Sequence, residues 1–222
     1  MRKGQAEKLR FKCIPAEFDE LWEYLAEMDG DVYFPQDEHQ SILGSQVVSK
    51  SFVHHLGDGL WRLAWLETQP DSRSCGFGTA HMEKLLTWLK NHQENPAKAL
   101  VFEIENRAKS GLSENQSDLR QQRGRFYERL SAQKWDRLLL VPMTKDRMTG
   151  RPRKSSPFRE MELMWIPLDG ESLGSAYLER AARFVLCDIG GLDDDEPLLS
   201  RILSGDFPDG YPKRYGDRVK CL

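Results

Sequence analysis

The sequence lacks the features that mark membrane, secreted and metal-stabilised proteins. No apolar run approaches the about 18 residues of a membrane-spanning helix, and residues 1–8 are polar, so we expect neither a membrane segment nor a signal peptide. The 4 cysteines are scattered without a Cys-x-x-Cys pair. That spacing argues against a zinc ribbon or a disulfide scaffold and indicates a reducing compartment, so we expect a cytoplasmic protein. The 5 histidines lack metal-ligand spacing, and we expect no metal site.

What is present is typical of a globular chain. Of its 222 residues, 39% are hydrophobic and 30% are charged. A chain of this length can bury about 70% of the surface that its unfolded form exposes, so it needs no covalent or metal crosslink. The length predicts one large domain or a domain with an appendage.

The charges are unevenly distributed. Residues 120–159 hold 12 Lys or Arg and 3 acids, a net charge of +9, so the remainder carries −12, with an acidic peak at 193–196. The basic block indicates either an anionic ligand bound at one place or a solvated basic face, and charge alone leaves both open. The acidic remainder and the lack of a nucleic-acid motif disfavour nucleic acid as a partner.

Hydrophobic periodicity predicts a mixed α/β fold whose central sheet has about six or seven strands flanked by helices. The expected strands span 8–14, 46–54, 60–67, 99–105, 138–143 and 158–166. The expected helices span 15–29, 79–92, 123–135 and 172–189, with one more from Pro197 and a short one at 37–43. Residues 106–122 are predicted to form a flexible loop, and strand 60–67 to be buried on both faces.

A glycine-rich loop at 73–78 follows strand 60–67 and leads into a helix. Such a loop is a ready anion site, because unpaired N–H groups and the helix dipole point at the same place. Gly76 and Gly78 would let a phosphate approach the backbone closely. No Gly-Lys-Ser/Thr follows, and His81 stands where a dinucleotide fingerprint needs glycine, so neither common nucleotide motif fits.

Two segments resemble motifs of the GNAT family, the GCN5-related N-acetyltransferases. Arg73-x-x-Gly76-x-Gly78, after a strand that ends before Pro70, is similar to that family's acetyl-CoA pyrophosphate loop. Arg125-Phe126-Tyr127-Glu128-Arg129-Leu130 resembles its Phe-Tyr-x-x-x-Gly helix, with strand 99–105 in the expected place between the two. The resemblance covers roughly residues 60–143 and is to a bacterial-type, single-domain member.

The resemblance implies a GNAT-like sheet that splays at an acyl-CoA cleft. It implies one domain over 1–204, with an acyl-CoA core at 60–143, extra C-terminal helices at 172–204 and a loosely ordered tail at 205–222. The implied co-substrate is acetyl-CoA, held by one strand end and the loop after it. The implied cofactor-binding residues are Leu66, Thr68, Arg73, Ser74, Cys75, Gly76, Phe77, Gly78 and Thr79.

The resemblance also implies catalytic candidates. A tyrosine at the place of Tyr127 lies near the thioether sulfur, where its phenol would protonate or hydrogen-bond the leaving thiolate. The alternative is an aromatic side chain packed beside Phe126. Glu103 is a candidate base, or else a salt-bridged acid on a largely buried strand. Glu67, at the end of its strand, is a second candidate base.

The expected function is transfer of an acetyl group from acetyl-CoA to a primary amine, on a small molecule or a peptide. The alternative is a non-catalytic acyl-CoA-binding module. Two departures favour that alternative: Ser131-Ala132 stands where the family has glycine, and 35–60 looks too short for a pair of strands with their loops. The acceptor itself, which would contact loops 31–59 and 144–157, cannot be identified from the sequence, and a homodimer is left open.

Overall fold

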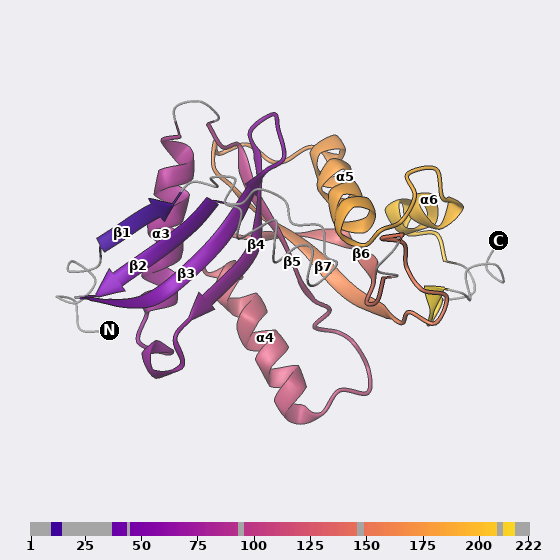
Figure 1. Ribbon diagram of the computed structural model, residues 1–222, viewed down its shortest axis with the longest axis horizontal. Helices are drawn as coiled ribbons and strands as arrows, with labels where there is room; N and C mark the ends of the chain where they lie inside the picture. Colours follow the sequence, from indigo (N-terminus) through magenta and orange to yellow (C-terminus); the bar gives the residue numbers. More distant parts are fainter. Residues whose placement is uncertain are drawn as a thin grey trace. The chain divides into compact units, whose positions relative to one another are not determined.

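A computed structural model describes residues 10–14, 37–43, 45–92, 96–145, 149–207 and 211–215. These form a mixed seven-stranded sheet in the order β1-β2-β3-β4-β5-β7-β6, flanked by four α-helices (Figure 1). The strands are β1 (Arg10–Ile14), β2 (Asp37–Leu43), β3 (Gln46–His55), β4 (Leu60–Thr68), β5 (Ala99–Glu105), β6 (Gln133–Pro142) and β7 (Phe158–Pro167). The α-helices are α3 (Phe77–Lys90), α4 (Glu114–Glu128), α5 (Ser175–Arg183) and α6 (Pro197–Ser204). The predicted sheet is confirmed, and no described helix is long and apolar enough to cross a membrane.

The chain divides into two compact units. Unit 1 comprises Met1–Glu20, Phe34–Phe102 and Pro167–Ser172; unit 2 comprises Leu21–Tyr33, Glu103–Ile166 and Leu173–Leu222. The expectation of one domain over 1–204 stays a prediction. The helix expected at 15–29 lies outside the described residues.

Unit 1 contains an antiparallel sheet, β1 to β4, with α3 packed on one face (Figure 1). Apolar side chains at helical spacing attach α3 to that face, and Met82, Leu85 and Leu89 are fully buried. The predicted parallel pairing of the two central strands is confirmed: β4 and β5 pair from Leu60↔Ala99 to Arg62↔Val101. The pairing ends there, although β4 continues for six more residues to Thr68.

Two sequence expectations about residues 35–60 are wrong. The short helix at 37–43 is strand β2, and the segment is long enough for the full β2–β3 hairpin. The strand was missed because its buried face is polar: His39 and Ser41 are buried beneath α3, so the usual apolar alternation is absent. One of the two departures that favoured a non-catalytic module therefore disappears.

Unit 2 contains the antiparallel pair β6–β7, with α4, α5 and α6. Helix α5 continues into a π-helical turn, η2 (Phe184–Ile189). The helix predicted at 172–189 is therefore α-helical over Ser175–Arg183 and π-helical over Phe184–Ile189. In the tail, which we expect to be loosely ordered, Arg214 bridges to Pro157. Tyr215 is buried there and its hydroxyl donates to Glu196 Oε2 at 3.0 Å.

The helix predicted at 123–135 is displaced. Helix α4 begins at Glu114, inside the expected loop at 106–122, and ends at Glu128; β6 then takes residues 133–142. The helix has no apolar stripe, so periodicity missed its first turns. A capping box was visible: Ser113 Oγ accepts from Gln116 N–H, and the Gln116 side chain accepts from Ser113 N–H.

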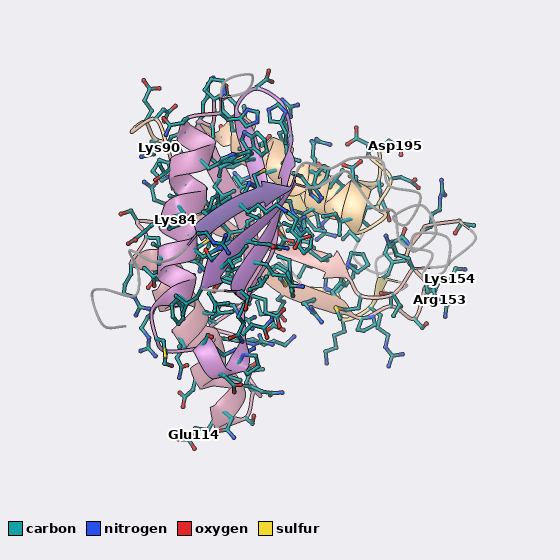
Figure 2. The ribbon with its side chains drawn as sticks, turned by 60° about the vertical axis from the view of Figure 1, so that its left-hand side comes forward. Lys84, Lys90, Glu114, Arg153, Lys154 and Asp195 are labelled. Atoms are coloured by element: carbon teal, nitrogen blue, oxygen red, sulfur yellow. The ribbon has the colours of Figure 1, made fainter. Side chains whose placement is uncertain are left out.

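Acids of unit 2 pair with part of the basic block. Arg151 lies 3.1 Å from Asp193, and Arg137 Nη1 lies 4.0 Å from Glu179. Arg153 and Lys154 remain exposed on the loop before β7, where Figure 2 labels them. Some cations of the block are therefore paired within the chain and others are solvated, while binding of an anionic ligand stays a prediction.

Candidate functional site

The glycine loop joins the end of β4 to the start of α3, within unit 1. A short 3-10 turn, Pro70–Ser72, follows the strand, and Gly76 caps the helix in the left-handed region with φ 82° and ψ 2°. Ser74 also has a positive φ, 59°. Left-handed residues within a tight turn draw neighbouring N–H groups toward a common point, which is the geometry of an anion-binding nest.

The N-terminus of α3 carries no side-chain cap. The first backbone hydrogen bond of the helix runs from Ala80 N–H to Gly76 O at 3.0 Å, so the N–H groups of Phe77, Gly78 and Thr79 precede it. These are the donors that a helix leaves without an internal acceptor, and the helix dipole adds partial positive charge at the same place. The loop thus has the geometry to bind a phosphate.

The predicted cofactor-binding residues occupy one continuous stretch of unit 1. Arg73 Nε donates to Thr68 O at 3.1 Å, which anchors its exposed guanidinium beside the loop. The Phe77 ring is buried with Val48 and Ala80, and Cys75 packs against the same cluster. Thr68 Oγ1 lies 2.9 Å from Ser49 Oγ. The side chains of Cys75 and Phe77 thus face the core, which leaves the backbone to contact a ligand.

The end of β4 is exposed on one face, so its predicted burial on both faces holds only for Leu60–Leu63. Trp65 is 42% exposed and lies 5.7 Å, centroid to centroid, from Phe52. Glu67, a candidate base, is half-buried and lies opposite Lys50 in the β3–β4 register. The Lys50 ammonium sits over the Trp65 ring, 5.0 Å from its centroid.

His81 links α3 to the hairpin beneath it. Its Nδ1 lies 2.9 Å from Ser41 Oγ and its Nε2 lies 2.8 Å from Ser51 Oγ. Burial, and then the charge of His39, lowers the pKa of His81 to about 3. The ring is therefore neutral at physiological pH, with one nitrogen donating and the other accepting. His81 is therefore a buried core histidine.

Tyr127 and Glu103 both belong to unit 2. The Tyr127 ring is buried and meets Phe126 at 5.0 Å, as its packing interpretation expects. Burial raises the pKa of the phenol to about 12; the charge of Arg123 lowers that pKa and the charge of Glu103 raises it. Glu103 is thus close enough to act electrostatically on Tyr127, and the phenol keeps its proton at neutral pH.

Sequence reasoning missed Arg107, which joins three elements of unit 2. Its backbone N–H and its Nε donate to the two oxygens of Glu162 on β7, both at 2.9 Å, and its Nη1 donates to Glu128 at the end of α4. Glu162 is buried, and Lys134 Nζ lies 3.5 Å from it. Gly124 on α4 makes room, because a Cβ there would collide with the guanidinium of Arg107.

The position where the GNAT motif has glycine is also informative. Ser131 adopts a left-handed conformation with φ 65°, and its N–H donates to Glu128 O at 3.0 Å. Glycine adopts this conformation without strain, whereas serine pays about 1–2 kcal/mol. The backbone turn is therefore retained without the glycine, and the second departure from the motif loses its weight.

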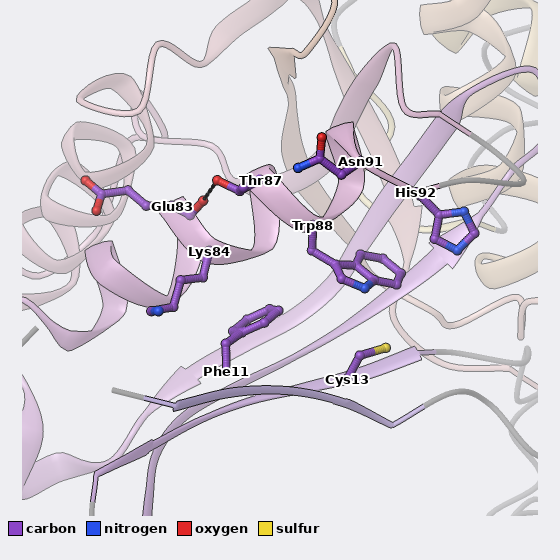
Figure 3. Close-up of a pocket in the computed structure, with 8 residues that line it drawn as sticks. All are labelled: Phe11, Cys13, Glu83, Lys84, Thr87, Trp88, Asn91 and His92. Atoms are coloured by element: carbon purple, nitrogen blue, oxygen red, sulfur yellow. Dashed lines mark hydrogen bonds between the residues drawn. The ribbon is translucent and has the colours of Figure 1, made fainter. Parts of the chain in front are cut away.

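A pocket of ≈ 780 Å³ lies elsewhere in unit 1, between β1 and the C-terminal half of α3 (Figure 3). Its aromatic lining comes from Phe11, Trp88 and His92, with Glu83 and Lys84 at one end. None of the predicted site residues lines it. Among the described residues no three His, Cys, Asp or Glu side chains gather in a way that could hold a metal ion.

The fold is that of a solved GNAT acetyltransferase structure. A protein assigned to that family, from Bacteroides thetaiotaomicron, matches 83% of this chain and 99% of its own with a TM-score of 0.53 and 15% identity. Weaker matches include the ribosomal-protein-S18-alanine N-acetyltransferase from Escherichia coli, at 16% identity and a TM-score of 0.43 over 74% of this chain and 99% of that one. A GNAT family acetyltransferase from Elizabethkingia anophelis with acetyl-CoA bound matches at 9% identity and 0.47, over 73% and 99%. No family model matches the chain, and no curated protein matches it.

Proposed function

We propose that this chain transfers an acetyl group from acetyl-CoA to a primary amine, as a cytoplasmic enzyme. The observation that carries the proposal is the uncapped N-terminus of α3, reached through a loop with left-handed backbone at Ser74 and Gly76, directly after a central strand. The fold shared with a GNAT acetyltransferase supports acyl-CoA as the ligand of that loop.

In the proposed mechanism the Gly76–Thr79 backbone holds the pyrophosphate, with Arg73 beside it. Backbone N–H groups near Leu66 and Thr68 receive the pantetheine arm and polarise the thioester carbonyl. A base takes the proton of the bound amine, the nitrogen attacks the carbonyl carbon, and CoA leaves as the thiolate. Much of the acceleration would come from holding the two reactants together.

We assign Glu67 as the base and Glu103 as the second candidate. Glu67 lies on the exposed face of β4, at the strand end that leads into the loop. Glu103 acts on Tyr127, where its charge favours the protonated phenol. Glu67→Gln and Glu103→Gln, each assayed across pH, separate the roles: loss of the base removes the acidic limb of the rate profile.

Tyr127 is proposed to donate a hydrogen bond to the departing thiolate. With a pKa of about 12, the phenol holds its proton more tightly than a thiol of pKa about 8.5, so complete proton transfer to the sulfur is uphill. Stabilisation of the thiolate by hydrogen bonding needs no such transfer.

The test begins with calorimetry of acetyl-CoA binding to the wild type and to Gly76→Val. Residue 76 has a backbone φ of 82°, which valine cannot adopt without strain. We expect binding by the wild type and its loss in the variant. Thiol release across a panel of primary amines follows. Binding without release for any amine would favour the non-catalytic module, and no binding would refute the proposal.

A further inference from the structure

A primary amine of the chain itself lies beside the proposed base. In the antiparallel β3–β4 pair, Lys50 stands directly opposite Glu67, and directly opposed residues have Cβ atoms about 4.5–5.5 Å apart. The Lys50 ammonium lies 5.0 Å from the centroid of the Trp65 ring, two residues before Glu67 on the same face.

The Trp65 ring holds this ammonium. Among the described residues, no carboxylate forms an ion pair with Lys50, whose ammonium instead makes the cation–π contact with Trp65. The Trp65 ring is 42% exposed and lies against Phe52. A ring quadrupole attracts an ammonium by about 0.5–1 kcal/mol at an exposed site, so the amine is positioned but easily released. It lies next to Leu66–Thr68, the proposed seat of the thioester.

We propose that Lys50 is an internal acyl acceptor and that the chain acetylates its own Lys50, an inference that rests on the proposed function. Glu67 takes a proton from the Lys50 ammonium. The freed Nζ attacks the thioester carbonyl carbon, a C–N bond forms, the C–S bond breaks, and CoA leaves as the thiolate. Nζ then loses its second proton, which the thiolate takes up, and Glu67 returns the first proton to solvent. The products are Nε-acetyl-Lys50 and CoA.

The strand register and the position of α3 distinguish Lys50 from three other lysines of unit 1, Lys12, Lys84 and Lys90. Lys12 belongs to the same row of the same face, but Gln40 on β2 separates it from Lys50, which places it about 10 Å away across two strand spacings. Lys84 and Lys90 lie on α3, which covers the opposite face (Figure 2). Lys12 is therefore the matched control.

Acetylation would change the acceptor face. It converts an ammonium over Trp65 into a neutral amide and removes the cation–π contact. The aromatic surface of Trp65 and Phe52 would then be open to an external amine, so Lys50 would occupy the acceptor site until it is modified.

The experiment incubates the folded chain with acetyl-CoA and maps acetyl groups by peptide mass spectrometry over time. We expect Lys50 to be modified at least about tenfold faster than Lys12, Lys84 and Lys90, and Glu67→Gln to remove that advantage without changing acetyl-CoA affinity. The rate per molecule should not depend on protein concentration. Lys50→Arg should leave the slow acetylation rate of Lys12 unchanged, and the urea-unfolded chain should show no preference among its lysines.

Two outcomes overturn the inference while leaving the proposed function intact: free amines are acetylated but Lys50 is not, or Lys50 and Lys12 react equally and Glu67→Gln has no effect. Failure to bind acetyl-CoA in calorimetry is a failure of the proposed function instead, and it removes the inference with it. Comparison of Glu38→Gln, an acid of the same face in the Phe52 row, separates the base from general charge effects.

Discussion

The helices α3 and α4 both carry candidate site residues, yet different forces attach them. Helix α3 buries six side chains against its sheet, whereas α4, of similar length, buries only Gly124 and Tyr127. Ion pairs hold α4 instead: Arg120 and Arg123 reach the two oxygens of Glu105, both at 3.4 Å, and Arg107 bonds Glu128. Apolar packing thus supports the candidate anion loop, whereas ion pairs support the helix that carries the candidate Tyr127.

The largest expected effect is on the hydrophobic side of this comparison. Leu85→Ala on α3 removes a fully buried side chain and should lower the free energy of unfolding by about 2–5 kcal/mol in urea denaturation. Leu119→Ala on α4 is the matched control, because Leu119 is 61% exposed and should change stability by less than about 0.5 kcal/mol. Equal losses in the two variants would contradict the contrast between the helices.

On the electrostatic side, Arg107→Met removes the guanidinium from the buried Glu162 carboxylate, which keeps Lys134 and the backbone N–H of residue 107 as partners. We expect a loss of about 2–3 kcal/mol in urea denaturation, somewhat below the usual cost of breaking a buried pair because Lys134 remains. The double variant Arg107→Met/Glu162→Gln should recover part of it, since it removes the stranded charge. No recovery would mean that Arg107 contributes through packing instead of charge.

Tyr127→Phe tests whether the Tyr127 hydroxyl on α4 stabilises the leaving thiolate. Loss of a hydrogen bond to a developing thiolate should lower the turnover number by about tenfold to a hundredfold, with acetyl-CoA affinity unchanged because the ring still packs. Wild-type turnover would remove Tyr127 from the mechanism and leave its packing beside Phe126 as its role. Gly76→Val on the α3 side should show the opposite pattern, with loss of cofactor binding.

The buried His81, which links α3 to the β2–β3 hairpin, makes the free energy of unfolding depend on pH. The folded pKa of His81, about 3, lies below its ordinary value of 6.5, so below pH 6.5 the unfolded chain takes up a proton that the folded chain does not. The contribution of His81 to the free energy of unfolding is therefore fully present above pH 6.5 and is lost as the pH drops toward 3. Between pH 7 and 5.5 the loss should be about 1 kcal/mol, measured by urea denaturation. In His81→Gln that slope should be smaller, whatever its absolute stability.

The smallest effect concerns the exposed end of α4. Arg123→Gln removes one of two pairs with Glu105 and should cost about 0.2–1 kcal/mol at low salt. At about 1 M NaCl the Debye length is about 3 Å, so screening should remove the difference in unfolding free energy between this variant and the wild type. Leu85→Ala should keep its full effect at that salt concentration. A salt-independent Arg123 effect would contradict an electrostatic attachment.

The same contrast explains what the sequence could reveal. The apolar spacing of α3 and the apolar residues of β3, β5 and β7 predicted those elements correctly. The first turns of α4 and strand β2 were missed because polar partners distant in the chain attach them, Glu105 for α4 and His81 for β2, and such pairing leaves no periodicity. The glycine loop was visible as a motif. The Arg107 contacts and the Lys50–Glu67 opposition depend on strand order and register, which the sequence did not supply.

The sheet order also bears on self-association. The two outermost strands are β1 and β6, and each carries charge: Arg10 and Lys12 are exposed on β1, and Lys134 and Asp136 on β6. If two copies paired antiparallel through β1, cations would face cations across the new ladder, which is destabilising. Edge strands protected in this way resist addition of another strand. Such charges oppose growth of the sheet from one molecule into the next and disfavour a homodimer of this chain through the β1 edge.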